Sequence, residues 1–247
     1  SDMVARLAGD EFTVVVRSVH NNQDLVRLIA KVKAGLGIKI PSCVAYDILF
    51  GCPGWVEGVI QAKAFIAAGM AKKCLVIGAD TLSRVLDQTD RDSMIYADGA
   101  GATVIEASEE TGGILAHKTA TFTADGEAEF IFYGKSNFSD KDTKYIKMFG
   151  RKVYEFALNQ VPIAIKDCLD ASGASIEDVK KIFIHQANLK MDEAIIKRFY
   201  RLYGMKMDAA VLPMNIHEFG NSSVATVPTL YDLVRKTNYG GHKVQAG

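Results

Sequence analysis

A strand–helix–strand pattern between residues 42 and 80 limits the possible folds more than any other feature. Two apolar runs of strand length, SCVAYDILF (42–50) and KKCLVIGAD (72–80), flank a helical pattern at residues 55–70. Both runs are apolar almost throughout, which is typical of strands covered on both faces rather than on one. A chain that alternates strands and helices in this way buries them in a layered sheet. The sequence therefore predicts an α/β fold.

Further elements of both kinds surround this unit. Residues 12–18 and 97–107 have strand patterns, and residues 23–37 have a helical pattern that ends at a glycine. The polar, glycine-containing segment at 108–113 is a candidate link to a second half. That half is expected to contain helices at 151–173, 191–204 and 223–237, the last interrupted early by Pro228, and a strand at 179–188 that ends in polar residues.

Composition excludes several classes of protein. Lys+Arg and Asp+Glu both number 29, so no net charge indicates a nucleic acid or an anionic membrane as partner. No signal-peptide layout and no apolar run long enough to span a bilayer is present. The four cysteines lack CxxC spacing, which argues against a metal site or a disulfide framework. We expect a cytoplasmic protein with reduced thiols.

Cys52 lies in the sequence FGCPG, between the first apolar run and the helical pattern. Gly51 and Gly54 permit a sharp turn there, and a cysteine before a helix meets unpaired N–H groups that favour the thiolate. Its own N–H could help to form an oxyanion hole. A buried structural cysteine is an equally good interpretation of Cys52 alone. It is the interpretation we adopt for Cys43, Cys74 and Cys168.

A nucleophilic thiol needs a partner from elsewhere in the chain. His185 ends the apolar run KIFI and opens HQAN, so it lies where a buried strand is expected to emerge, a frequent site position in α/β folds. Asn221 lies in GNSS and could donate a hydrogen bond beside it. Ser222 and Ser223 of the same motif are read as helix-capping residues of a polar loop.

These motifs together carry a family resemblance. GIKIPSCVAYDILFGCPGW, LVIGADTLSRVLDQTDR, YADGAGATVIEASEE, IFIHQANLKM and FGNSSVATVP occur in this order. From about residue 37 the chain resembles β-ketoacyl-acyl-carrier-protein synthase III. The resemblance implies a thiolase-like, layered α/β/α/β/α fold of two similar halves. Residues 37–110 would be part of the first half, and residues 111–247 the second half without its last strand.

The resemblance also implies a reaction. Cys52 would be the acylated nucleophile, and His185 and Asn221 would support decarboxylation. An acyl-CoA would acylate Cys52, and malonyl-acyl-carrier protein would then lose carbon dioxide and attack the thioester. No metal or redox cofactor is implied. The partners would be acyl-CoA, the acyl-carrier protein and a second copy of the chain in a homodimer.

Other assignments from the resemblance concern binding. Arg91 and Lys190 fall where the family places basic residues near the entrance for CoA or phosphopantetheine. Lys190 departs from the usual arginine, which keeps the charge but loses the forked geometry. A solvated charge is an equal alternative for each. Trp55 could line the acyl pocket, although core packing is the simpler interpretation.

Residues 1–36 resemble another family. RLAGDEF (6–12) is similar to the signature of GGDEF diguanylate cyclase domains, with Ala8 in place of the first glycine and with Asp10 and Glu11 as the acidic residues. The other metal and guanine contacts of such a domain are missing, so we expect no cyclase activity. The segment could occupy the place of the strand and helix of the synthase half that are missing. The alternatives are a nucleotide-signalling module that binds GTP or a cyclic dinucleotide, and a catalytically inactive composite chain.

Overall fold

The computed structural model describes residues 11–17, 44–110, 112–139 and 141–244. These form two compact units. Unit 1 consists of the described residues up to Asp80 together with 98–110 and 222–229; unit 2 consists of the described residues within 81–97, 112–221 and 230–244. The helix expected at 23–37, the motif at 6–10 and Cys43 lie outside the described residues.

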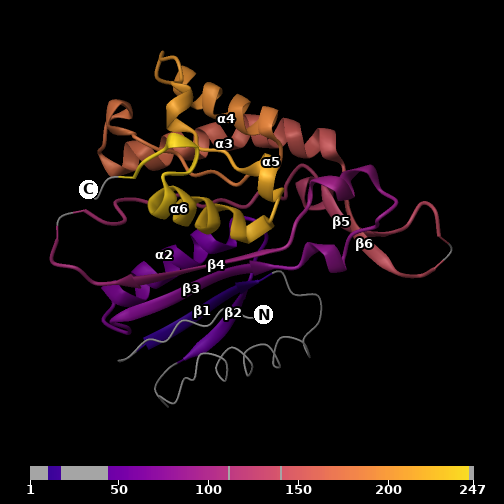
Figure 1. The fold of residues 1–247 in the computed structure, drawn as a ribbon, viewed down its shortest axis with the longest axis horizontal. Helices are drawn as coiled ribbons and strands as arrows, with labels where there is room; N and C mark the ends of the chain where they lie inside the picture. Colours follow the sequence, from indigo (N-terminus) through magenta and orange to yellow (C-terminus); the bar gives the residue numbers. More distant parts are fainter. Residues whose placement is uncertain (1–10, 18–43, 111, 140, 245–247) are drawn as a thin grey trace. The chain divides into compact units, whose positions relative to one another are not determined.

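Unit 1 is built on a four-stranded sheet with the order β2-β1-β3-β4 (Figure 1). β1 (Glu11–Arg17) pairs in parallel with both β2 (Ala45–Leu49) and β3 (Lys73–Asp80), and β4 (Gly99–Glu106) closes the edge antiparallel to β3. The predicted strands at 12–18, 42–50, 72–80 and 97–107 are therefore confirmed. β1 lies between β2 and β3, so the segment that resembled a GGDEF domain supplies an inner strand of this sheet.

Helix α2 (Gly54–Ala67) connects β2 to β3 and covers one face of the sheet (Figure 1). Ala62 of the helix and Cys74 and Val76 of β3 are fully buried against one another. Trp55 packs at the margin of this cluster. The cluster explains why the sequence alternates apolar strand and helix here, since burial of each valine-sized side chain stabilises the fold by about 1.5–3 kcal/mol.

Glycines on β3 and β4 allow the segment 222–229 to lie directly on the sheet. A Cβ atom on Gly78 would come within 2.7 Å of the Val224 carbonyl oxygen, and one on Gly101 within 2.7 Å of Pro228. A Cβ atom on Gly99 would likewise meet Ser222 at 2.8 Å. The glycines of the DGAGA sequence therefore let the sheet pack directly against this segment.

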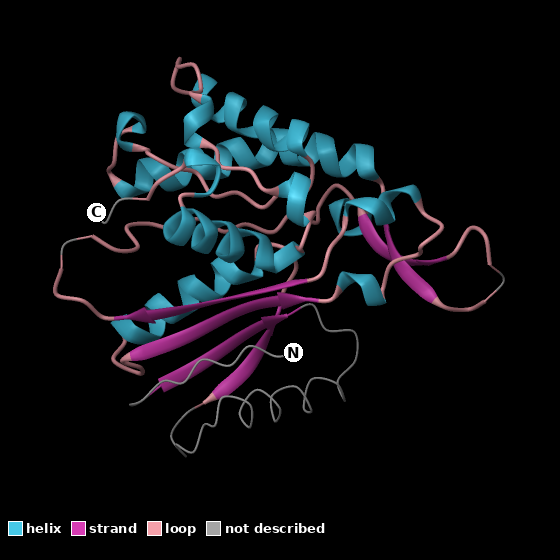
Figure 2. Ribbon diagram, in the orientation of Figure 1, coloured by secondary structure: helices cyan, strands magenta, loops and turns pink. Residues whose placement is uncertain are grey.

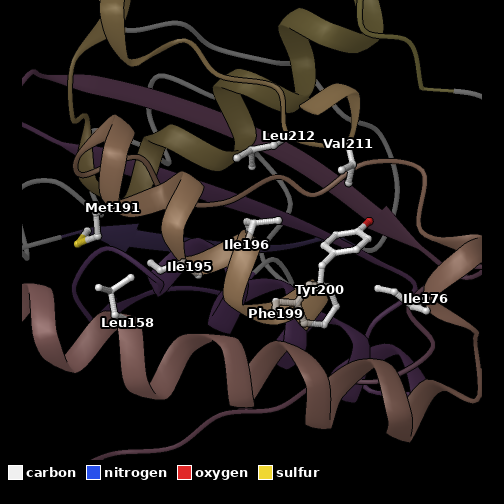
Figure 3. Packing of buried hydrophobic residues seen from close by; sticks show 9 residues of the cluster. All are labelled: Leu158, Ile176, Met191, Ile195, Ile196, Phe199, Tyr200, Val211 and Leu212. Carbon is white, nitrogen blue, oxygen red and sulfur yellow. The ribbon is translucent and has the colours of Figure 1, made fainter. Parts of the chain in front are cut away.

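Unit 2 contains the helices α3 (Gly150–Ser172) and α4 (Leu189–Arg201). Their apolar faces meet in one buried cluster, which Figure 3 shows from close by. Phe199 and Tyr200 of α4 stack edge to face there, with ring centroids 5.4 Å apart. The members of the cluster are Leu158, Ile176, Met191, Ile195, Ile196, Phe199, Tyr200, Val211 and Leu212.

The predicted helix at 223–237 is present in part. Residues Ser223–Ala225 form a 3-10 turn, and α6 (Thr226–Thr237) follows. The predicted interruption of the helix at Pro228 is wrong. Pro228 lies in the first turn of α6, where a backbone N–H has no helical partner, so proline is tolerated there.

Two parts of unit 2 differ from expectation. A hairpin of β5 (Ile131–Lys135) and β6 (Lys144–Met148) was not predicted. The strand predicted at 179–188 is wrong: within the described residues this run forms no strand, and Ile182 N–H donates to the Val211 carbonyl at 2.8 Å. Its apolar side chains, among them Ile182 and Ile184, cover the α3–α4 cluster instead.

The remaining elements are short (Figure 2). They are α5 (Ile216–Phe219) and the 3-10 turns Leu82–Arg84, Arg91–Ile95, Glu127–Glu129, Ile176–Asp178, Ala209–Val211 and Tyr239–Gly241. In the part of the chain that the structure describes, every helix is too short or too polar to cross a membrane.

Candidate active site

Cys52 lies in the turn that leads from β2 into α2. The turn is closed by the Gly54 N–H, which donates to the Gly51 carbonyl at 2.8 Å, and the helix begins at Gly54. The thiol is half-buried. It therefore combines access from outside with the positive end of a 14-residue helix, as the sequence predicted.

Ser223 contacts this thiol, which the sequence analysis did not foresee. Its hydroxyl donates a hydrogen bond to Cys52 Sγ at 3.6 Å, across 171 positions of the chain and within unit 1. Ser223 is 4% exposed and has a φ of 53°, in the left-handed region that serine rarely adopts. A donor held there by a strained backbone favours the thiolate form of Cys52.

Two replacements of Ser223 separate the hydroxyl from the backbone strain. Ser223→Ala and Ser223→Gly both remove the donor, so in both Cys52 should react with iodoacetamide only at higher pH than in the wild type. The glycine variant should be more stable than the alanine variant by about 1 kcal/mol, because only glycine accepts the left-handed conformation without strain. Alkylation rate against pH and urea unfolding measure the two effects. Unchanged alkylation in both variants would show that the hydroxyl does not act on the thiol.

His185 is half-buried and opens the turn that precedes α4. The next residue, Gln186, is fully buried and fixes the turn from both ends of its amide: Nε2 donates to the Pro213 carbonyl at 3.3 Å, and Oε1 accepts from Asn215 N–H at 2.9 Å. Asn188 caps α4, accepting from Met191 N–H at 3.1 Å. Each polar residue of HQAN after the histidine thus has a role in holding His185 in place.

Asp192 is a buried carboxyl in the same unit, and the sequence analysis missed it. It is 1% exposed, and burial raises its pKa to about 7, against the opposing effects of His185 and of the Asn188 and Ala187 backbone N–H groups. The sequence does offer a way to find it: the apolar residues of α4 recur at helical spacing, and Asp192 occupies one of the positions that this spacing predicts to be buried.

Asn221 is held by its backbone. Its N–H donates to the Ile95 carbonyl at 2.7 Å, and its carbonyl accepts from Ala97 N–H at 2.8 Å. The preceding Gly220 has φ 63° and ψ −163°, and a Cβ atom there would lie 3.2 Å from both the Ile95 oxygen and the Ala97 Cβ. Only glycine fits at this position, which leaves Asn221 buried at 3% exposure with a fixed backbone.

Arg91 is exposed and lines a pocket of about 590 Å³ in unit 2, between residues 86–96 and the β5–β6 hairpin. The pocket wall is stiffened by Lys147, which bonds to Asp87 at 2.8 Å and to Asp90 at 2.5 Å. The hydrogen bond from Lys147 holds the pKa of Asp87 well below its usual range. Because Lys147 is already neutralised by these carboxylates, Arg91 is a more available cation for an anionic ligand.

The other predicted residues have simpler settings. Lys190 is exposed in the first turn of α4 and is not part of the Arg91 pocket. Cys74 is fully buried, and burial raises the pKa of its thiol, so its structural role is as predicted.

Cys52 belongs to unit 1, whereas His185 and Asn221 belong to unit 2.

Comparison with known proteins places these motifs in a family. The family model described as 3-oxoacyl-[acyl-carrier-protein (ACP)] synthase III matches residues 46–125, and the model of its C-terminal part matches residues 169–244. A β-ketoacyl-[acyl-carrier-protein] synthase III of Acaryochloris marina is 33% identical, over 94% of this chain and 70% of the relative. The chain belongs to the synthase III family. A Streptococcus pneumoniae synthase III is 34% identical, over 92% of this chain and 69% of the relative.

Solved synthase III structures share the fold. The Thermus thermophilus enzyme superposes with a TM-score of 0.77 at 28% identity, over 92% of this chain and 68% of that one. The Aquifex aeolicus enzyme gives 0.75 at 28% identity, over 90% and 67%. The predicted thiolase-like α/β fold is therefore confirmed. A match over 94% of the chain also extends into residues 1–36, while the domain boundaries at 36 and 110 stay a prediction.

Proposed function

We propose that this synthase III family member performs a decarboxylating Claisen condensation between an acyl-CoA primer and malonyl-acyl-carrier protein, the step that starts fatty-acid or related chain synthesis. The observation that carries the proposal is the setting of Cys52: a half-buried thiol before a helix, with the Ser223 hydroxyl donating to it. Family membership supplies the reaction class, and Cys52, His185 and Asn221 all fall within the matched ranges.

In the first half-reaction, Cys52 takes up the acyl group. The thiolate attacks the carbonyl carbon of the acyl-CoA, a new C–S bond forms, and the CoA thiolate leaves and takes up a proton. The N-terminal end of α2 and the Ser223 hydroxyl favour the attacking thiolate. No metal or redox cofactor enters this step.

In the second half-reaction, the malonyl thioester loses carbon dioxide. The bond to the carboxylate breaks, and its electron pair becomes an enolate whose oxygen accepts hydrogen bonds from His185 and Asn221. The enolate carbon attacks the acyl-Cys52 carbonyl, the 3-oxoacyl-carrier protein leaves, and the Cys52 thiolate is restored. Both donors suit this role because their backbones are fixed, by Gln186 and by the contacts around Gly220.

The proposal extends to binding and assembly. Arg91, exposed at its pocket, and Lys190, exposed on α4, would meet the phosphates of CoA or of the carrier's phosphopantetheine. The protein would work as a cytoplasmic homodimer with the acyl-carrier protein as its partner. The place of β1 inside the synthase sheet favours this function over a nucleotide-signalling role for the start of the chain.

Mass spectrometry of the intact protein tests the proposal. After incubation with acetyl-CoA or longer acyl-CoAs, the chain should gain the mass of one acyl group, and peptide mapping should locate it on Cys52. Addition of malonyl-acyl-carrier protein should then discharge the adduct as a 3-oxoacyl product. A folded protein that gains no acyl group from any acyl-CoA would overturn the proposal.

A further inference from the structure

We infer that Asp192 is a positioning residue for His185, which ties the state of the imidazole to the ionisation of a buried carboxyl. The inference rests on the proposed function for its consequence, because His185 is assigned to the decarboxylation step. The coupling between the two side chains stands on the structure of unit 2 alone.

The position of Asp192 on α4 is one that packing would fill with an apolar residue. The helix buries six residues: Met191, Asp192, Ile195, Ile196, Phe199 and Tyr200. Asp192 is the charged member of this set, and it is as buried as Phe199, each at 1% exposure. An unpaired carboxyl at such a position costs several kcal/mol in the ionised form, so its presence calls for a compensating role.

An aspartate near the start of a helix usually caps the helix or pairs with a cation one turn away, and Asp192 does neither. Asn188, not Asp192, caps the helix. The neighbours of Asp192 one turn away along α4 are Asn188, Leu189, Ile195 and Ile196, and none of them is a cation. Its Oδ2 atom is buried and has no hydrogen-bond partner among the described residues. The carboxyl is therefore neither a cap nor half of an ion pair within the helix.

The polar groups that act on the Asp192 carboxyl belong to the turn that carries His185. The backbone N–H groups of Ala187 and Asn188 act on the carboxyl as hydrogen-bond donors, and the His185 imidazole interacts with it electrostatically. These three residues lie within the sequence HQAN. The carboxyl thus holds the turn by its backbone and stabilises positive charge on the imidazole.

The ionisation of Asp192 changes within the range in which the enzyme would work. Its pKa is raised to about 7, so near neutral pH the carboxyl exists in both forms. Charge coupling is reciprocal: if an imidazolium favours the carboxylate, the carboxylate favours the imidazolium by the same amount. His185 should therefore hold its proton more firmly than it would beside a neutral residue.

An NMR titration of the histidine rings tests the coupling without any turnover. The His185 signal is assigned by its loss in His185→Asn. In Asp192→Asn and Asp192→Leu its pKa should fall by about one unit or more, the size expected when an opposite charge nearby is removed. Glu193→Gln is the matched control, since Glu193 lies beside Asp192, its side chain is 41% exposed, and it pairs with Lys197 at 2.8 Å.

The outcomes separate this inference from the proposed function. Equal His185 titrations in wild type, both Asp192 variants and the control would overturn the inference, whatever the enzyme does. A shifted titration confined to the two Asp192 variants supports it, even if acyl-CoA leaves no adduct on Cys52. If the enzyme turns over, the pH dependence of kcat for malonyl decarboxylation should move to lower pH in Asp192→Asn and stay unchanged in Glu193→Gln.

Discussion

Cys52→Ala will abolish the acyl adduct, whereas His185→Ala and Asn221→Ala will acquire the adduct and fail to discharge it. The two half-reactions need different groups. In the proposed mechanism acyl transfer needs the Cys52 thiolate, while decarboxylation needs donors aimed at the enolate oxygen. Removal of one such donor typically costs about 10²–10³ in rate. The His185 and Asn221 variants should therefore accumulate acyl-enzyme while condensation slows by that factor.

Rapid-quench mass spectrometry resolves the two steps, with adduct formation measured before malonyl-acyl-carrier protein is added and adduct loss measured afterwards. Cys168→Ala is a matched control, because Cys168 is another half-buried thiol of the chain and should not affect either step. If the His185 and Asn221 variants formed no adduct but Cys168→Ala did, both residues would serve acylation, and the assignment to decarboxylation would be wrong.

The elements of unit 1 could be predicted from the sequence because each depends on local pattern. Continuous apolar runs at 42–50 and 72–80 favour strands of a covered sheet, and the structure has β2 and β3 there. The sequence did not say which segment would approach Gly78 and Gly101, because that partner lies more than 120 positions further along the chain.

The predictions that were wrong concern segments whose structure depends on contacts with residues far away in the sequence. The run at 179–188 has strand composition, but a strand exists only if a neighbour pairs with it, and here the apolar side chains pack on the α3–α4 cluster instead. Ser223 was read as a helix cap because serine is common there; its left-handed backbone and its bond to Cys52 depend on tertiary structure. Asp192 could have been found, since it breaks the apolar spacing of α4.

Asp192→Asn will make the protein more stable than the wild type at pH 8 and leave its stability nearly unchanged near pH 4. The carboxyl has a pKa of about 7 in the folded protein, against about 4 in an unfolded chain. Because the pKa of Asp192 is higher in the folded protein than in the unfolded chain, the contribution of this carboxyl to stability is fully present below about pH 4. It is lost as the pH rises through 7. At about 1.4 kcal/mol per unit, the penalty at pH 8 approaches roughly 4 kcal/mol, and the amide removes it.

Urea unfolding of both proteins between pH 4 and 8 measures this difference, because the titrating groups that do not interact with Asp192 cancel in the comparison. The gap between the two free energies of unfolding should widen steadily between pH 4 and 7 and level off above it. Glu193→Gln should show no such widening, since the Glu193 side chain is 41% exposed and pairs with Lys197, so its charge remains hydrated. A constant gap for Asp192→Asn would mean that the carboxyl ionises in the folded protein as it does in water. The buried charge would then be too weakly perturbed to act on His185.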